Sequence, residues 1–120
     1  MQRTARAIGI LSATLAVMAC GGGDDDGNGG DPCDDAPAFA EVSAFQVCVN
    51  CHSSSKVGDD RNGSPPNVNF DTYDAAAQNA QRGANQVARG TMPPPEKPEF
   101  SLTPAQRETL EKWAECGAPR

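Results

Sequence analysis

The five residues Cys48-Val49-Asn50-Cys51-His52 decide what this chain can fold around. They place two thiols three positions apart, followed at once by the single histidine of the 120-residue chain. In a C-x-x-C-H motif each thiol can add to one vinyl group of a haem, and the adjacent histidine then lies beneath the iron as a ligand. The motif therefore predicts one haem c, covalently bound through Cys48 and Cys51, with His52 as a metal ligand.

Two other chemistries use the same residue types. A redox-active C-x-x-C of the thioredoxin kind is one alternative, although that fold needs a β-sheet and no stretch of this sequence alternates polar and apolar residues as strands do. A structural zinc site built from four cysteines is the other alternative.

Large apolar side chains are scarce. From Cys20 onwards, Leu, Ile, Val and Phe together account for 12 of 101 residues. A chain of this composition is normally disordered, or needs a disulfide or a cofactor in order to fold. A buried porphyrin would supply the missing apolar surface at about 25 cal/mol per Å². The aromatic residues expected to form a wall around it are Phe39, Phe45, Phe70, Tyr73 and Trp113.

The N-terminal segment has the features of a bacterial export signal. Two arginines precede a run of 12 mostly apolar residues, Ile8 to Ala19, which is too short to span a bilayer. The run ends in Val17-Met18-Ala19-Cys20, which resembles a lipobox. Residues 1–19 are therefore predicted to be a lipoprotein signal peptide, and Cys20 the lipidated first residue of the mature chain. The alternative is an ordinary signal peptide followed by an incidental cysteine.

Residues 20–35 are predicted to be a flexible tether. The stretch 21–35, GGGDDDGNGGDPCDD, combines glycines with six aspartates, and like charges on a flexible chain keep it extended. The tether carries most of the mature chain's net charge of −8 and leaves −2 on residues 36–120. Because neither part offers a basic surface, no nucleic-acid partner is expected.

Residues 36–120 predict a small all-α domain of about three helices wrapped around the haem. A first helix is expected over 37–47, where apolar residues recur at three-residue spacing. A second, over 71–90, begins at an aspartate suited to an N-cap and ends at a glycine. A third, over 103–117, opens with the capping box TPAQ. The proline-rich segment 91–100 cannot be α-helical.

A C-x-x-C-H motif directly after the first helix, on an exported chain, resembles a small monohaem cytochrome c of the class I type, here carried as a bacterial lipoprotein. In that family the distal ligand is a methionine in the loop between the last two helices, and the resemblance assigns this role to Met92. Elimination agrees, because Met92 is the only methionine after the signal segment and a second histidine is lacking. The alternatives at the sixth position are an open site or one of three lysines. These lysines are Lys56, Lys97 and Lys112.

The resemblance implies four further site residues. In the family, the carbonyl of a proline after the motif accepts a hydrogen bond from the histidine Nδ1–H, and Pro65 or Pro66 matches that position. The first and last helices cross in such proteins, which implies a disulfide between Cys33 and Cys116 in an oxidising compartment. Free thiols are the alternative.

The function implied is that of a membrane-tethered one-electron carrier and not of an enzyme. Its partners would be unidentified redox donor and acceptor proteins and, through Cys20, a membrane; the chain is expected to be a monomer. It would lie on the periplasmic side of a bacterial membrane, with the outer membrane favoured over the inner because Gly21 follows the lipidated cysteine. The alternatives are a haem-based sensing or catalytic domain with a labile or open sixth position, and an interaction module that uses haem only as a structural staple.

Overall fold

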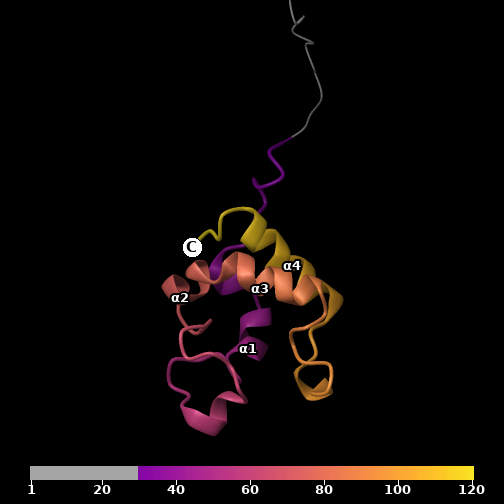
Figure 1. Ribbon diagram of the computed structural model, residues 1–120. Helices are drawn as coiled ribbons and strands as arrows, with labels where there is room; N and C mark the ends of the chain where they lie inside the picture. Colours follow the sequence, from indigo (N-terminus) through magenta and orange to yellow (C-terminus); the bar gives the residue numbers. More distant parts are fainter. Residues whose placement is uncertain (1–29) are drawn as a thin grey trace, which may run out of the picture.

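The computed structural model describes residues 30–120. The predicted signal peptide, the predicted lipidation site Cys20 and the predicted tether up to residue 29 lie outside the described residues. Within 30–120 the chain forms four α-helices, three 3₁₀ turns and no strand (Figure 1). The prediction of an all-α domain is therefore confirmed, although the number of helices is four and not three. None of these helices combines the length and apolar character needed to cross a membrane.

The first predicted helix is interrupted. In place of a continuous helix over 37–47, the structure has a 3₁₀ turn, η1 (Phe39–Glu41), and a short helix, α1 (Ala44–Cys48). The backbone leaves the helical region at Val42, where φ is −79° and ψ is 81°, and the side chain of Val42 is only 2% exposed. We infer that burying the Val42 side chain stabilises the fold more than a continuous helix would. The break sets the direction of α1, which ends at the first cysteine of the motif.

The second predicted helix is also two helices, α2 (Tyr73–Gln78) and α3 (Ala80–Ala88). Asn79 separates them, and its side-chain amide donates a hydrogen bond to the carbonyl of Ala75 at 2.9 Å. Such local side-chain bonds compete with the regular helical ladder. Gly90, the predicted end, has a φ of 70° and follows the last turn of α3.

Asp71 is not the N-cap of α2, contrary to the prediction. Thr72 takes that position, and Asp71 instead accepts hydrogen bonds from the backbone N–H and hydroxyl of Ser54 and from the hydroxyl of Ser53. The hydroxyl of Ser54, followed by the other hydrogen bonds, lowers the pKa of Asp71 against the effect of desolvation. The ionised carboxylate thereby ties the loop that follows His52 to the start of α2.

The last helix, α4 (Pro104–Glu115), is formed as predicted. Thr103 and the side chain three residues into the helix make the expected capping box. α4 packs against α3, as Figure 1 shows. Its side chain Trp113 is fully buried and donates from Nε1 to the carbonyl of Pro119 at 2.8 Å. The Trp113 ring meets the ring of Phe45 edge to face, with centroids 5.1 Å apart, so α4 is joined to α1 through aromatic packing. The proline-rich segment carries one 3₁₀ turn, η3 (Pro98–Phe100).

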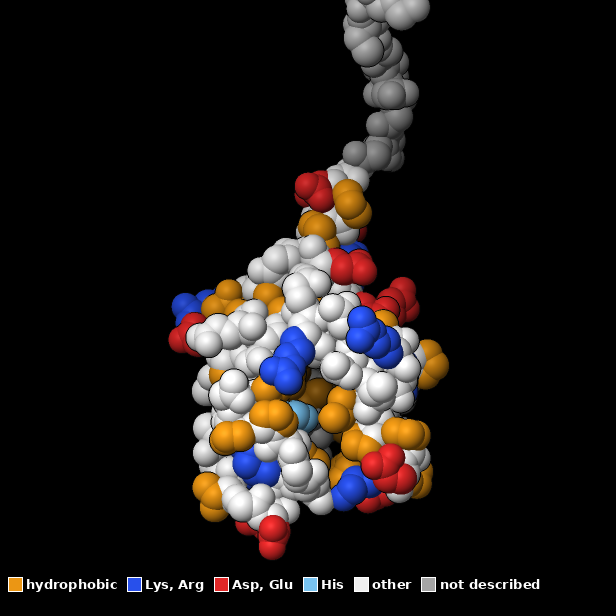
Figure 2. Space-filling view, in the orientation of Figure 1, with side chains coloured by type: hydrophobic (Ala, Val, Ile, Leu, Met, Phe, Trp, Pro, Cys, Tyr) orange, Lys and Arg blue, Asp and Glu red, His pale blue; other side chains and the backbone are white. Residues whose placement is uncertain are grey.

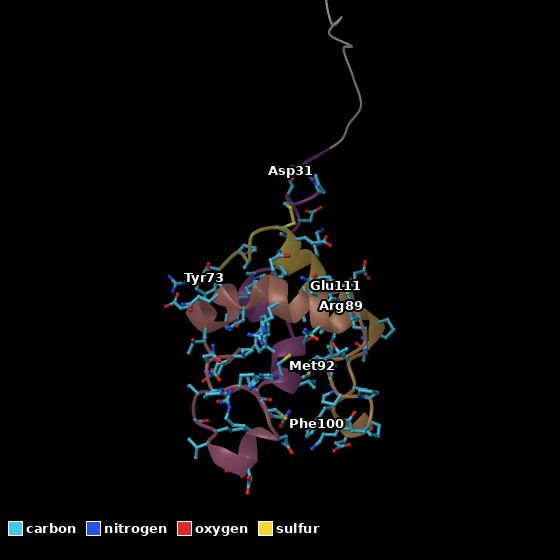
Figure 3. The ribbon with its side chains drawn as sticks, in the orientation of Figure 1. Asp31, Tyr73, Arg89, Met92, Phe100 and Glu111 are labelled. Carbon is cyan, nitrogen blue, oxygen red and sulfur yellow. A yellow bond between two sulfur atoms is a disulfide. The ribbon has the colours of Figure 1, made fainter. Side chains whose placement is uncertain are left out.

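Cys33 and Cys116 are joined by the disulfide that the resemblance implies (Figure 3). It links the segment before η1 to the residue that follows α4, across 83 positions of sequence. Both termini of the described domain are thereby fastened together at the end of the helical layer.

Replacing both of these cysteines, Cys33→Ser with Cys116→Ser, is expected to lower the free energy of unfolding by about 4 kcal/mol, because the unfolded chain regains the entropy of an open loop of this length. Guanidinium denaturation of the wild type and the variant measures the difference. Reductant should destabilise the wild type and leave the variant unchanged. Equal unfolding free energies for the two oxidised proteins would contradict the prediction.

Candidate haem site

One cavity of about 330 Å³ gathers the predicted ligands. Cys48, Cys51 and His52 line it from the end of α1 and the turn that follows, and Met92 lines it from the loop after α3. Figure 2 shows the histidine ring inside the hollow at the centre of this face, surrounded by apolar side chains. Residues 40 positions apart in the sequence are thus brought to one site.

The local fold explains why both thiols and the imidazole reach the cavity. Asn50 donates from its side chain to the carbonyls of the last turn of α1 and ends the helix. The backbone N–H groups of Cys51 and His52 then both donate to the carbonyl of Cys48, at 3.2 and 2.9 Å. This tight turn keeps the three side chains together. Both thiols are free, and burial raises the pKa of the Cys48 thiol to about 11, so Cys48 is protonated at neutral pH.

His52 is held in the tautomer that a metal requires. Its Nδ1 lies 3.0 Å from the carbonyl oxygen of Val68. A carbonyl can only accept, so Nδ1 carries the proton and Nε2 carries the lone pair, which accepts from the hydroxyl of Ser64 at 3.4 Å. Burial, opposed by the hydrogen bond with Val68, lowers the pKa of His52, and the positive charges of Arg61 and Arg82 act in the same direction as burial. The neutral imidazole that results is the form that ligates metals.

The prediction that the carbonyl of Pro65 or Pro66 accepts the hydrogen bond from His52 Nδ1–H is wrong. The carbonyl of Pro65 accepts from the guanidinium of Arg61 at 2.6 Å, and that of Pro66 accepts from the side chain of Asn69 at 3.1 Å. A turn in which the N–H of Val68 donates to Pro65 carries the chain past both prolines. The carbonyl that reaches the ring is therefore that of Val68, three residues after Pro65 and two after Pro66. Pro65 still lines the cavity.

The predicted aromatic wall is largely wrong as well. Of its five members only Phe70 lines the cavity. The rest form an aromatic cluster with ring centroids 5.1 to 6.2 Å apart, consisting of Phe39, Phe45, Tyr73 and Trp113. The apolar lining residues that the sequence did not reveal are Val47, Val68, Phe100 and Leu110. They come from four separate segments and share no spacing, so only the folded chain brings them together.

Gly83 lets α3 approach this wall closely. A Cβ atom at this position would lie 3.0 Å from Cζ of Phe70, closer than side-chain atoms normally approach. The glycine weakens the helix by up to about 1 kcal/mol, and it is tolerated because it allows α3 to lie directly against Phe70 beside the cavity.

The charged residues that line the cavity are two cations, Arg82 and Lys97, without an acidic residue among them. Figure 2 shows Lys and Arg side chains beside the hollow. Nζ of Lys97 donates to the side chain of Asn62 at 2.7 Å, and the amide of Asn62 donates to Sγ of Cys51 at 3.5 Å. A mainly apolar cavity with cations at its side suits an apolar macrocycle that carries carboxylates.

The structure excludes several of the alternative chemistries and ligands considered for this site. Cys33 and Cys116 bond to each other, and no cluster of three or more His, Cys, Asp or Glu side chains able to hold a metal ion occurs in residues 30–120, so a four-cysteine zinc site is wrong. The described chain also lacks the sheet of a thioredoxin-like protein. Of the three lysines considered as a sixth ligand, only Lys97 lines the cavity. The donor set of two free thiols, one neutral imidazole and one thioether fits a covalent haem.

A scan against protein-family profiles, a search of the curated proteins and a search of the solved structures find no match for this chain. Function therefore follows from the chemistry of the site alone.

Proposed function

We propose that the protein is a one-electron carrier of the cytochrome c type, lipid-anchored through Cys20 at the periplasmic side of a bacterial membrane. The observation that carries the proposal is the meeting of Cys48, Cys51, His52 and Met92 at one cavity. The two thiols would hold the haem covalently, and Nε2 of His52 and the thioether of Met92 would bind its iron. When bound, haem supplies a one-electron Fe(III)/Fe(II) couple.

The residues of the chain bind, orient and shield the group. The hydrogen bond from His52 Nδ1–H to the carbonyl of Val68 fixes the ring and increases its basicity as a ligand. Met92 would supply a second ligand to the iron, which would leave no open position for a substrate, as expected of a carrier and not of an enzyme. The mainly apolar lining would cover much of the bound macrocycle. Redox donor and acceptor proteins would approach where the cavity opens on the face seen in Figure 2.

The absorption spectrum of the protein tests this proposal. The full chain is produced in a bacterium with cytochrome c maturation, and its spectrum is recorded oxidised, reduced, and reduced under carbon monoxide. We expect haem that survives denaturing electrophoresis, a sharp α-band after reduction, a weak far-red iron–sulfur band in the oxidised form, and no change under carbon monoxide.

Each other outcome has a definite meaning. A protein that acquires no covalent haem would overturn the proposed function. Covalent haem whose spectrum shifts under carbon monoxide would replace the carrier by the sensing or catalytic alternative, because the sixth position would then be open to a ligand.

A further inference from the structure

Arg61 is a buried cation without a carboxylate partner in the described part of the chain. It ends the 3₁₀ turn η2 (Gly58–Arg61) and is only 5% exposed. Burying a charge is costly unless hydrogen bonds compensate it, and the five N–H groups of the guanidinium face six acceptors, all of them neutral, so at least one N–H is shared between two acceptors. The acceptors are the carbonyls of Ser53, Lys56, Ser64, Pro65 and Val68 and the side-chain carbonyl of Asn69.

One of these acceptors also holds the proximal histidine. The carbonyl oxygen of Val68 accepts from Nη2 of Arg61 at 3.1 Å and lies 3.0 Å from Nδ1 of His52. A carbonyl oxygen has two lone pairs, so it can accept both donors at once. A guanidinium remains charged at every accessible pH. A permanent positive charge is therefore separated from the imidazole by a single oxygen atom.

We propose that Arg61 raises the reduction potential of the haem by weakening the hydrogen bond from His52 to Val68. The inference rests on the proposed function. A strong Nδ1–H···O=C bond pushes electron density through the ring to the metal and favours its oxidised state. Arg61 draws density from the same oxygen, so Val68 accepts less from His52 and the ring donates less. The buried positive charge itself also favours the state with one more electron.

Arg61 is thus a positioning residue that acts through Val68 and does not touch the haem ligand. Its effect has the same sign as that of the methionine ligand, which favours the ferrous state. Hydrogen bonding around a ligand and local charge are two of the means by which a protein tunes a haem potential.

Arg61→Met tests the inference in the haem-loaded protein. We expect the equilibrium constant for reduction to fall about tenfold, which is 59 mV for a one-electron couple. We also expect the His52 Nδ1–H resonance of the reduced protein to move downfield, because its hydrogen bond becomes stronger. Asn69→Ala is the matched control. It removes an acceptor that competes with Val68 for Nη2 of the same guanidinium while keeping the charge, so the potential should not fall and the Nδ1–H resonance should not move downfield.

Arg61→Lys provides a second test in case Arg61→Met does not fold. It keeps the positive charge but not the planar fork of donors, so a smaller fall in the same direction is expected. A purely structural role would lower the melting temperature without moving the potential and the Nδ1–H resonance together. Haem-loaded variants with the wild-type potential, or a higher one, would overturn the inference and leave the proposed function standing. Absence of covalent haem from the wild type would overturn both.

Discussion

We expect Met92→Ala to turn the haem-loaded protein into one that binds carbon monoxide. Met92 is the only methionine after the predicted signal segment, and it lines the same cavity as His52, from the loop after α3. Without its thioether the sixth position has no sulfur ligand. The far-red band of the oxidised protein should disappear, and carbon monoxide should shift the spectrum of the reduced protein.

The same variant should also lower the reduction potential. A methionine ligand favours the ferrous state, and axial ligands as a whole spread haem potentials over about 0.8 V. We therefore expect Met92→Ala to lower the potential by on the order of 100 mV or more. A spectroelectrochemical titration of both proteins measures the difference.

Two controls separate Met92 from its rival at the cavity. Lys97→Ala removes the one lysine that lines the cavity, and this variant should keep the far-red band and stay inert to carbon monoxide. Met92→His refills the position with a nitrogen ligand, so it should lose the far-red band and still exclude carbon monoxide. The assignment fails if Lys97→Ala opens the site and Met92→Ala does not.

The features of the fold that could be predicted from the sequence depend on short-range interactions. The capping box at Thr103, the left-handed glycines at 90 and 117 and the C-x-x-C-H motif each depend on residues a few positions apart, and the structure has the helix ends where these signals place them. The breaks at Val42 and Asn79 depend on burial and on a side-chain hydrogen bond that compete with helix propensity. Propensity and periodicity therefore overestimated the length of two helices.

The unpredicted parts of the site depend on long-range packing. Which carbonyl reaches His52 is decided by how the turn after Pro65 folds, and proline positions alone do not fix it. Arg61 lies in a stretch, GDDRNG, whose composition is that of an exposed loop. Its burial is visible only when the surrounding carbonyls are seen to converge on it. The predicted aromatic residues are buried or partly buried, but four of the five pack on one another, and the cavity is lined by Phe70, Phe100 and aliphatic side chains.

Removing both motif thiols, Cys48→Ala with Cys51→Ala, is expected to leave a chain that does not fold cooperatively. The apolar core of residues 30–120 contains 14 buried residues, of which six are alanine. The lining of the hollow of about 330 Å³ is mainly apolar, and apolar surface that no group covers forgoes about 25 cal/mol per Å² of burial. The whole stability of a small domain is only about 5–15 kcal/mol. The folded state should therefore depend on the group that fills the cavity.

Far-UV circular dichroism and urea titration measure this dependence. The haem-free double-alanine variant should lose most of its helical signal and its sigmoidal unfolding curve. The haem-loaded variant with serines at positions 33 and 116 should keep both, because it lacks the disulfide but retains the filled cavity. Haem added to the double-alanine variant should restore helicity, since His52 and Met92 remain to bind it and binding to the folded state alone stabilises that state. Full helicity and cooperative unfolding without haem would show that the protein chain supplies its own core, and would remove the physical reason for placing a macrocycle in this cavity.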